Sequence, residues 1–294
     1  RGGGGRHIDM TNRTRKRRPL RTAVRLLLLI LAAALLIFWD NTALQVTHAD
    51  AAFPTLPAGF DNCRIVVLGD LHTASFGEDN VHLLETVAEQ APEYIFLVGD
   101  LVDAGREVPP GYLAAVASGL SAIAPTYYVT GNHEWAVGHV PEMKETLAEN
   151  GVHVLSNQSL SLTRNEDRII LAGIDDPNGY ADQKTPEEVA QEVAEEWGDP
   201  FWILLAHRNN AFAEHYSRLG ADLVVSGHGH GGLVRLPFTD GLVSTEHTFF
   251  PSYTAGLYEK NGSTLFVTRG LGNSGFTFRL FNRPEVAVLT LHKG

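Results

Sequence analysis

The sequence has almost no cysteine: Cys63 is the only one among 294 residues. A disulfide within the chain is therefore excluded, and so is a metal site built from several thiolates. Cys63 begins the apolar run that ends at Leu68, so we expect it to be a small buried apolar side chain. Metal chemistry in this chain would have to use nitrogen and oxygen ligands.

Basic residues are scarce outside the N-terminal segment. Nine of the 23 Lys and Arg residues fall within residues 1–25, where Asp9 is the only acid. The rest of the chain has 14 basic and 33 acidic residues, which gives it a net charge of −19. Because nucleic-acid contacts need a basic stripe for the phosphates, we expect no nucleic-acid partner. No protein partner is predicted either.

The longest apolar run, LLLLILAAALLIFW from Leu26 to Trp39, directly follows this basic segment. With Arg25 reaching the interface, residues 23–39 are long enough for a transmembrane anchor. The basic residues 1–22 would form an unstructured cytoplasmic tail, and the positive-inside rule places residues 40–294 outside the cytoplasm. We therefore expect a single-pass protein of the cell membrane with a cytoplasmic N-terminus.

A cleaved signal peptide is the alternative, since Ala49-Asp50-Ala51 resembles the small-residue sites at which such peptides are cut. The anchor is favoured because this site lies well beyond Trp39. Under either alternative the residues that follow lie outside the cytoplasm.

Five short motifs, far apart in the sequence, combine acids, an amide and histidines: GDLH at 69–72, GDLVD at 99–103, GNHE at 131–134, AH at 206–207 and GHGH at 227–230. The first three follow apolar runs typical of buried strands, so their polar residues are expected where strands end. Side chains at the carboxyl ends of neighbouring strands collect at one edge of an α/β sheet, where ligands usually bind.

These residue types suit metal-assisted hydrolysis. Carboxylate, amide and imidazole ligands in one cluster match borderline divalent metals such as Mn, Fe or Zn. Two such ions about 3.5–4 Å apart can hold a hydroxide between them and clamp both oxygens of a displacement at phosphorus. The motifs therefore predict two divalent ions per chain, bridged by a shared carboxylate, and a phosphoester substrate.

The motifs resemble those of the calcineurin-like metallophosphoesterase superfamily, from about Asn62 to the end of the sequence. The resemblance implies a four-layer α/β/β/α sandwich of two mixed sheets with a dinuclear metal site at one edge, preceded by the transmembrane helix. It also implies the ligands: Asp70, His72 and His230 for one metal, Asn132, His207 and His228 for the other, and Asp100 as the bridge. His133 would then be the catalytic general acid that protonates the leaving oxygen.

The resemblance divides the chain after the anchor into a lead-in segment, residues 40–61, and a catalytic domain, residues 62–294. The first part of the lead-in, DNTALQVTHADA at 40–51, resembles the strand-like lead-in of members from the cell envelope. The stretches GHGHGGLVRLPF and RGLGNSGFTFRLFNRPEVAVLTL resemble bacterial membrane-associated, phosphodiesterase-like members. Gly69 and Gly229 depart from the residues common in the superfamily, but neither position is a ligand. The other histidines are interpreted as surface or core residues rather than ligands: His7, His48, His82, His139, His153, His215, His247 and His292.

Local patterns predict alternating strands and helices between residues 64 and 149, which implies parallel pairing. The expected strands are 64–68, 94–98 and 126–129, and the expected helices are 80–89 and 141–149. Two hairpins are predicted, at 159–174 and at 255–270, the second turning at Asn261-Gly262. A helix after Pro109-Pro110, a helix at 186–196, strands at 201–205 and 223–225 and a last strand at 285–292 complete the pattern.

We therefore expect a phosphodiesterase at the membrane, outside the cytoplasm, that uses metal-bridging hydroxide and acts on a lipid- or nucleotide-linked phosphate. A phosphomonoesterase or phosphoprotein phosphatase is the alternative, and a non-catalytic envelope scaffold is the alternative from another class. Retention of all seven ligands and His133 favours an enzyme. Two arginines, Arg208 and Arg235, are interpreted either as phosphate contacts or as structural ion pairs. Four aromatic residues lie in loops expected to rim the site, and they are interpreted either as contacts for an apolar or base-like group or as local packing of those loops: Tyr180, Phe249, Phe250 and Tyr253.

Overall fold

The computed structural model describes residues 17–236, 240–244, 248–275 and 278–294. The interpretations of residues 1–16, including His7, and of His247 lie outside the described residues. The chain forms two compact units, Arg1–Trp39 and Asp40–Gly294. Helix α1 (Arg17–Thr42) includes the apolar segment Leu20–Thr42, which has the length and composition to cross a membrane.

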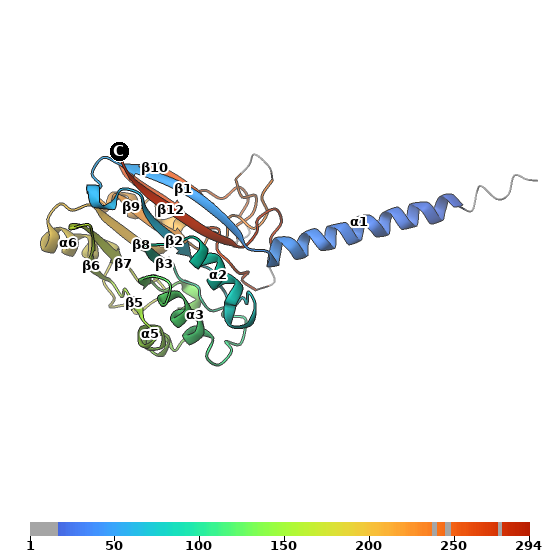
Figure 1. Ribbon diagram of the computed structural model, residues 1–294, viewed down its shortest axis with the longest axis horizontal. Helices are drawn as coiled ribbons and strands as arrows, with labels where there is room; N and C mark the ends of the chain where they lie inside the picture. The colour runs from blue at the N-terminus through green and yellow to red at the C-terminus, as the bar shows by residue number, and fades with distance from the viewer. Residues whose placement is uncertain (1–16, 237–239, 245–247, 276–277) are drawn as a thin grey trace, which may run out of the picture. The chain divides into compact units, whose positions relative to one another are not determined.

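The second unit contains two six-stranded sheets (Figure 1). The first sheet has the order β1-β12-β2-β3-β4-β5 and is parallel except between β12 and β2. Its strands are β1 (Gln45–Phe53), β12 (Glu285–Lys293), β2 (Cys63–Leu68), β3 (Tyr94–Leu97), β4 (Thr126–Tyr128) and β5 (Val152–Val154).

The second sheet has the order β10-β11-β9-β8-β7-β6. Its strands are β10 (Gly256–Lys260), β11 (Ser263–Val267), β9 (Leu223–Gly227), β8 (Trp202–Arg208), β7 (Asp167–Gly173) and β6 (Gln158–Arg164). The pairs β6/β7 and β10/β11 are the two predicted antiparallel hairpins. At the second turn Asn261 and Gly262 both have positive φ, 52° and 81°, as a tight primed turn requires.

Strand β12 shows how the layers are held together. Ala287, Leu289 and Leu291 belong to the core between the two sheets, whereas Val286 and Val288 pack on the opposite face, against the helices. This period of two is what a strand buried on both faces produces.

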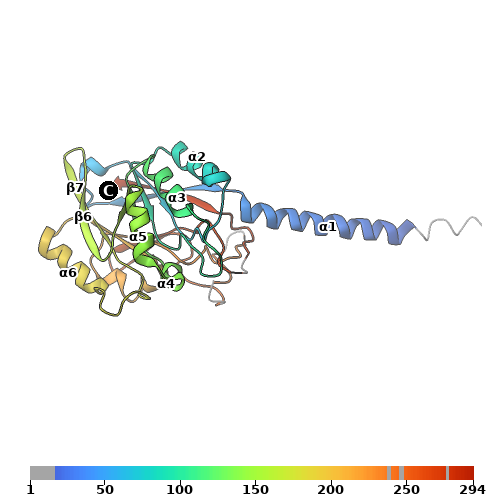
Figure 2. The same cartoon turned by 90° about the horizontal axis from the view of Figure 1, so that it is seen from below.

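Helices cover both outer faces (Figures 1 and 2). On the first sheet lie α2 (Val81–Glu89), α3 (Tyr112–Ser121) and α5 (Val140–Glu149), and on the second lies α6 (Pro186–Trp197). Helix α6 begins with Thr185, whose hydroxyl accepts the Glu188 N–H, and with Pro186 in the first turn. The predicted four-layer α/β/β/α arrangement is confirmed.

Some features were not foreseen. The strand-like lead-in forms β1, but its parallel pairing with β12 was not predicted, and β1 belongs to the same compact unit as the rest of the domain. The short strand β5 and the short helix α4 (Asn132–Val137) also carry too little periodicity to be predicted from their sequences. The remaining elements are short 3-10 turns: η2 (Ala58–Phe60), η3 (Glu78–Asn80), η4 (Asn209–Ala211) and η5 (Tyr216–Arg218).

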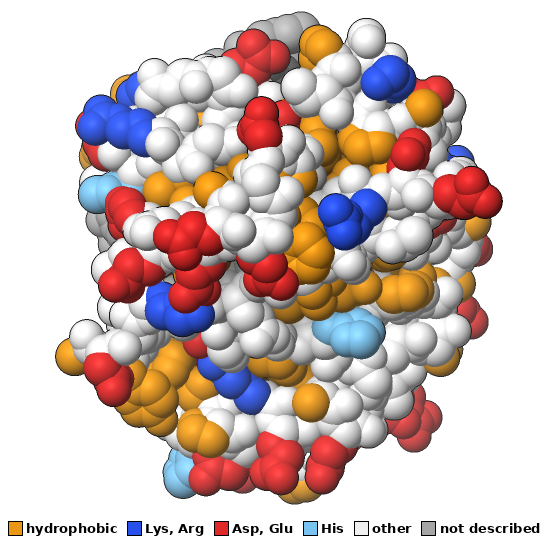
Figure 3. Space-filling view, turned by 90° about the vertical axis from the view of Figure 1, so that its left-hand side faces the viewer, with side chains coloured by type: hydrophobic (Ala, Val, Ile, Leu, Met, Phe, Trp, Pro, Cys, Tyr) orange, Lys and Arg blue, Asp and Glu red, His pale blue; other side chains and the backbone are white. Residues whose placement is uncertain are grey.

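The surface agrees with the acidic composition. On the face shown in Figure 3, acidic side chains are spread widely and basic side chains lie singly among them. This face therefore offers no continuous basic stripe for a nucleic-acid backbone.

Candidate active site

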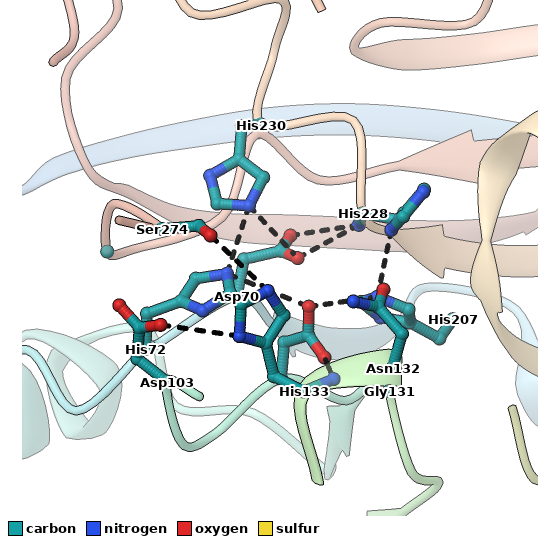
Figure 4. Close-up of polar contacts among 12 residues, drawn as sticks. Asp70, His72, Asp103, Gly131, Asn132, His133, His207, His228, His230 and Ser274 are labelled. Carbon is teal, nitrogen blue, oxygen red and sulfur yellow. Dashed lines mark hydrogen bonds and ion pairs between the residues drawn. The ribbon is translucent and has the colours of Figure 1, made fainter. Parts of the chain in front are cut away.

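The five sequence motifs meet at the carboxyl ends of five strands. Asp70 and His72 follow β2, Asp100 follows β3, and Asn132 and His133 begin α4 after β4. From the second sheet come His207, within β8, and His228 and His230, which follow β9. The side chains of both groups point toward one centre (Figure 4).

Asp70, His72 and His230 form the first cluster and are all buried. Nε2 of His72 lies 3.0 Å from Nε2 of His230, which in turn lies 3.6 Å from Oδ1 of Asp70. Ligands bonded tetrahedrally at about 2.1 Å to one ion are about 3.4 Å apart, so these three atoms are spaced as ligands of one metal.

The second cluster is built from Asn132, His207 and His228. Nε2 of His207 lies 3.2 Å from Oδ1 of Asn132 and 3.2 Å from Nδ1 of His228. The same nitrogen is 3.1 Å from Oδ2 of Asp100. These distances again match the spacing of ligands around a single ion.

Asp100 lies between the two clusters. Its Oδ2 is 3.1 Å from Nε2 of His207 in the second cluster and 3.7 Å from Nε2 of His72 in the first. One carboxylate therefore reaches both clusters, as a bridging ligand must. A further grouping, His72, Asp100 and His133, also has its ligand atoms within 4.8 Å of one another, so proximity alone does not separate His133 from the ligands.

The electrostatics of the clusters favour bound cations. Burial lowers the pKa values of His72 and His228 to about 3, so both rings are neutral and present a lone pair. Burial also opposes a charge on His207, but the charge of Asp100 and the bond to it outweigh burial and raise the pKa of His207 to about 10. A positive charge beside Asp100 is thus strongly stabilised, which is the condition a metal needs.

The backbone at these positions is strained. Five of the residues have left-handed backbone angles, with φ between 47° and 67°: Asp70, His72, Asp100, His228 and His230. This conformation costs a residue with a Cβ roughly 1–2 kcal/mol. It brings each side chain back over the end of its strand, and such strain collects at functional sites.

Hydrogen bonds between the loops hold these conformations. The Asp70 N–H donates to Gly99 O at 3.0 Å and the His72 N–H donates to Asp100 O at 2.9 Å. The His228 N–H donates to the Asp70 carboxylate, 3.0 Å from either oxygen. The backbone of each motif is therefore held by another motif.

Glu134, which the sequence motif includes without a role, ties two motifs together. Its buried carboxylate accepts the N–H groups of Asp100 at 2.9 Å, Leu101 at 2.7 Å and Gly131 at 2.7 Å. Burial raises the pKa of Glu134 to about 7, and the backbone donors oppose that rise. The residue fixes the loop after β3 against the start of α4.

His133 is oriented by three neighbours. Its Nδ1 lies 3.0 Å from the Ala104 N–H nitrogen and 3.3 Å from Oδ1 of the buried Asp103, while Nε2 lies 3.3 Å from Oγ of Ser274. With Nδ1 accepting the Ala104 N–H, a neutral ring carries its proton on Nε2; when the ring is charged, Asp103 stabilises it. Sequence reasoning missed Asp103 and Ser274, although the GDLVD motif contains the first.

A cavity of about 390 Å³ opens over the clusters. It is lined by Asp100, Asn132, His133, Asn178, Arg208, His228 and Ser274. Arg208 makes a two-point ion pair with the buried Asp176, at 2.7 and 3.0 Å, so the structural ion pair that the sequence left open exists. The same side chain faces the cavity, because the ion pair holds it there.

The other residues expected near the site differ in whether they line its cavities. Arg235 donates to Gly231 O and to Thr254 Oγ1 and does not line this cavity. Tyr253 lines a neighbouring cavity of about 320 Å³ that also reaches His228. Phe249 and Phe250 are 75% and 76% exposed, and Tyr180 packs edge-on against Trp135.

Arg279 is a further residue that the sequence did not reveal. It is fully buried, and its Nη2 lies 3.4 Å from Nδ1 of His230. It donates to the backbone oxygens of Gly272 and Arg269 at 2.7 and 2.8 Å. Burial lowers its pKa to about 10, which still leaves it positively charged at neutral pH.

Comparison with known proteins agrees with this geometry. Residues 63–232 match the family described as calcineurin-like phosphoesterase. The chain belongs to this family. It is 29% identical over 256 residues to the uncharacterized metallophosphoesterase YkuE of Bacillus subtilis, covering 84% of this chain and 85% of that protein.

Two further relatives extend over more of the chain. The uncharacterized metallophosphoesterase Cj0846 of Campylobacter jejuni is 29% identical over 276 residues, with 92% of this chain and 70% of that protein covered. The transmembrane protein with metallophosphoesterase domain of Danio rerio is 30% identical over 282 residues. That match covers 90% of this chain and 62% of the fish protein. The chain is thus a metallophosphoesterase, a hydrolase of phosphoester bonds, and its apolar helix and relatives indicate a membrane protein.

The close packing of Gly131 against Asp100 gives a test of the site. A Cβ at position 131 would overlap Oδ1 of Asp100 and lie 2.5 Å from its backbone nitrogen. We expect Gly131→Ala to displace the carboxylate, with a loss of bound metal and a roughly 10²-fold loss of turnover. Gly105→Ala is the matched control, because its Cβ would meet only Asp103 Oδ1, at 3.5 Å. Normal metal content and turnover in Gly131→Ala would contradict this account of Asp100.

Proposed function

We propose that this metallophosphoesterase is a phosphodiesterase, attached to the membrane by residues 23–39 and acting outside the cytoplasm. The observation that carries the proposal is the position of Asp100, whose Oδ2 lies 3.1 Å from a ligand atom of one cluster and 3.7 Å from one of the other. The proposed ligands are Asp70, His72 and His230 for one ion and Asn132, His207 and His228 for the other, with Asp100 shared. Mn, Fe or Zn fits this mixture of oxygen and nitrogen donors.

When bound, two such ions would supply an activated water and neutralise charge on the phosphoryl oxygens. The remaining steps belong to the protein. His133 faces the cavity with Nε2 and, in its charged form, is placed to give the Nε2 proton to the leaving oxygen. The ring is then neutral and keeps its Nδ1 proton, which faces the Asp103 carboxylate. Arg208, fixed by Asp176, and the side chain of Asn178 are placed to bind a phosphoryl oxygen.

A second cavity supports a diester over a monoester. The space of about 320 Å³ beside His228 is lined mainly by small polar residues together with Tyr253, and its described lining contains no Lys, Arg, Asp or Glu. A diester carries two organic groups on phosphorus, and two adjoining cavities that share His228 offer a place for each. A phosphomonoester would use only one of them.

The activity is tested with two chromogenic substrates. We expect the full-length protein to hydrolyse bis-p-nitrophenyl phosphate faster than p-nitrophenyl phosphate with Mn, Fe or Zn, and to hold close to two ions by elemental analysis. Asp100→Asn should lose both metal and activity, because the shared carboxylate is weakened at both clusters. Asp50→Asn is the control, since that carboxylate is 73% exposed and lies on β1. One ion per chain with full activity would contradict the two-metal proposal.

Substituting His133 distinguishes a general acid from a metal ligand. His133→Ala should keep close to two ions and lose roughly 10²- to 10⁴-fold in turnover, the usual effect of a positioned acid. The loss should be smaller for a nitrophenyl ester than for an alkyl ester, because nitrophenolate leaves without a proton. His228→Ala should fail equally on both esters. Metal depletion in His133→Ala, with equal losses on the two esters, would assign His133 to the metal ligands instead.

The proposed topology rests on the basic N-terminal cluster and the apolar helix that follows it. The full-length protein should sediment with membranes, and protease added outside spheroplasts should cut the domain that begins at residue 40. A domain that stays intact until the cells are lysed would reverse the orientation.

A further inference from the structure

Two described stretches of chain, residues 272–275 and 278–283, contact both the candidate active site and residues 40–44, and together they are called the connecting segment. At the active-site end, Ser274 Oγ lies 3.3 Å from His133 Nε2, and Arg279 Nη2 lies 3.4 Å from His230 Nδ1. At the other end, Asn41 bonds the same segment three times. Its Nδ2 donates to Arg279 O at 2.9 Å, and its Oδ1 accepts from Arg279 N at 2.8 Å and from Asn273 Nδ2 at 2.7 Å.

Neighbouring residues strengthen this connection. The Asp40 carboxylate is 4% exposed and accepts the Phe281 N–H at 2.6 Å. Arg283 donates through Nε to Ala43 O at 3.0 Å and through Nη2 to Leu44 O. The apolar run ends at Trp39, and Asp40 follows it directly in the sequence.

Large aromatic side chains are exposed on this segment and on a loop paired with it. Phe278 and Phe281 are 51% and 49% exposed, and Phe249 and Phe250 are 75% and 76% exposed. The two regions are joined through the bridges Val234–Leu280 and Val243–Phe249 and a bond from Arg235 N to Leu280 O. We call these four phenylalanines the aromatic surface. Such a concentration of exposed apolar side chains marks a surface that contacts a partner or a membrane.

We propose that the aromatic surface contacts the lipid bilayer, holds the active site at the membrane surface, and delivers to it a phosphoester carried by a membrane lipid. The inference rests on the proposed phosphodiesterase activity and membrane attachment. A bilayer is the occupant because Asp40 and Asn41, which bond the segment that carries Phe278 and Phe281, directly follow the apolar run. Phe, like Trp and Leu, is a side chain that segments lying in the membrane interface bury at the boundary between headgroups and acyl chains.

Lipid contact is tested by placing single cysteines on the full-length protein in phospholipid vesicles. Cys63 is fully buried, so a spin label will react with the introduced cysteine alone. Labels at Phe278→Cys and Phe281→Cys should collide more with oxygen and less with a water-soluble nickel chelate than labels at two controls. The controls are Tyr180→Cys and Leu257→Cys, which replace apolar side chains that are 60% and 37% exposed. Equal access of the chelate to all four labels would overturn the proposal. It would also be overturned if the labels at positions 278 and 281 were shielded from the chelate by a bound protein rather than by lipid.

Delivery of the substrate is tested with two diesters that share one leaving group. The probes are hexadecyl p-nitrophenyl phosphate in the same vesicles and soluble ethyl p-nitrophenyl phosphate. The unaltered protein should show at least a tenfold higher kcat/KM for the hexadecyl ester. The double variant Phe278→Ser/Phe281→Ser should bring that ratio close to one without changing hydrolysis of the ethyl ester, and Leu257→Ser should leave both unchanged.

The possible failures are distinguishable. Hydrolysis of the ethyl ester with no preference for the hexadecyl ester in the unaltered protein would overturn the inference and leave the proposed function standing. Hydrolysis of neither ester would overturn the proposed function itself. A preference that survives in the double variant would show that the aromatic surface does not deliver the substrate.

Discussion

The geometry of the site depends on hydrogen bonds that hold unfavourable backbone conformations at the ends of the strands. Five of the proposed ligands adopt left-handed angles, which their side chains disfavour when nothing compensates. The compensation comes from other motifs: the loop after β2 bonds to the loop after β3, and Glu134 bonds that second loop to Gly131. No motif is fixed by its own sequence alone, so the two sheets must form before the donor atoms converge.

The same hydrogen bonds and ion pairs determine how the negative charges near the site are compensated. The acidic excess of the domain does not collect as free charge at the site, because Asp176 is paired with Arg208 and Glu134 with backbone donors. Asp70 and Asp100 remain for cations. Arg279, buried behind His230, adds a fixed positive charge near Asp70 without occupying a ligand position. Asp70 and Asp100 also accept backbone N–H groups, from His228 and His133, so the carboxylates that face the metal clusters help to hold the loops as well.

Sequence patterns predicted the parts of the fold that depend on local periodicity. The strands before GDLH, GDLVD and GNHE and both hairpins are found, because apolar runs and Asn-Gly turns carry their signal within a few residues. The motifs also predicted which residues converge. The pairing of the strand-like lead-in with β12, Ser274 and Arg279 were missed because each depends on a contact with residues more than 45 positions away in the sequence. Composition carries no information about such partners.

The pairing of β1 with β12 has a consequence for the biogenesis of the protein. Strand β1 emerges from the ribosome directly after the apolar helix, yet its partner residues follow about 240 positions later, as in the pair Gln45 and Glu285. Until then β1 has no partner strand in the sheet, and the position between β1 and β2 stays empty. Long-range pairing of this kind slows folding, so the unfinished sheet edges need protection during synthesis. The ion pair of Arg269 with Glu285 at the start of β12 also waits for the last strand, and so does the part of the Arg279 site that Arg269 forms.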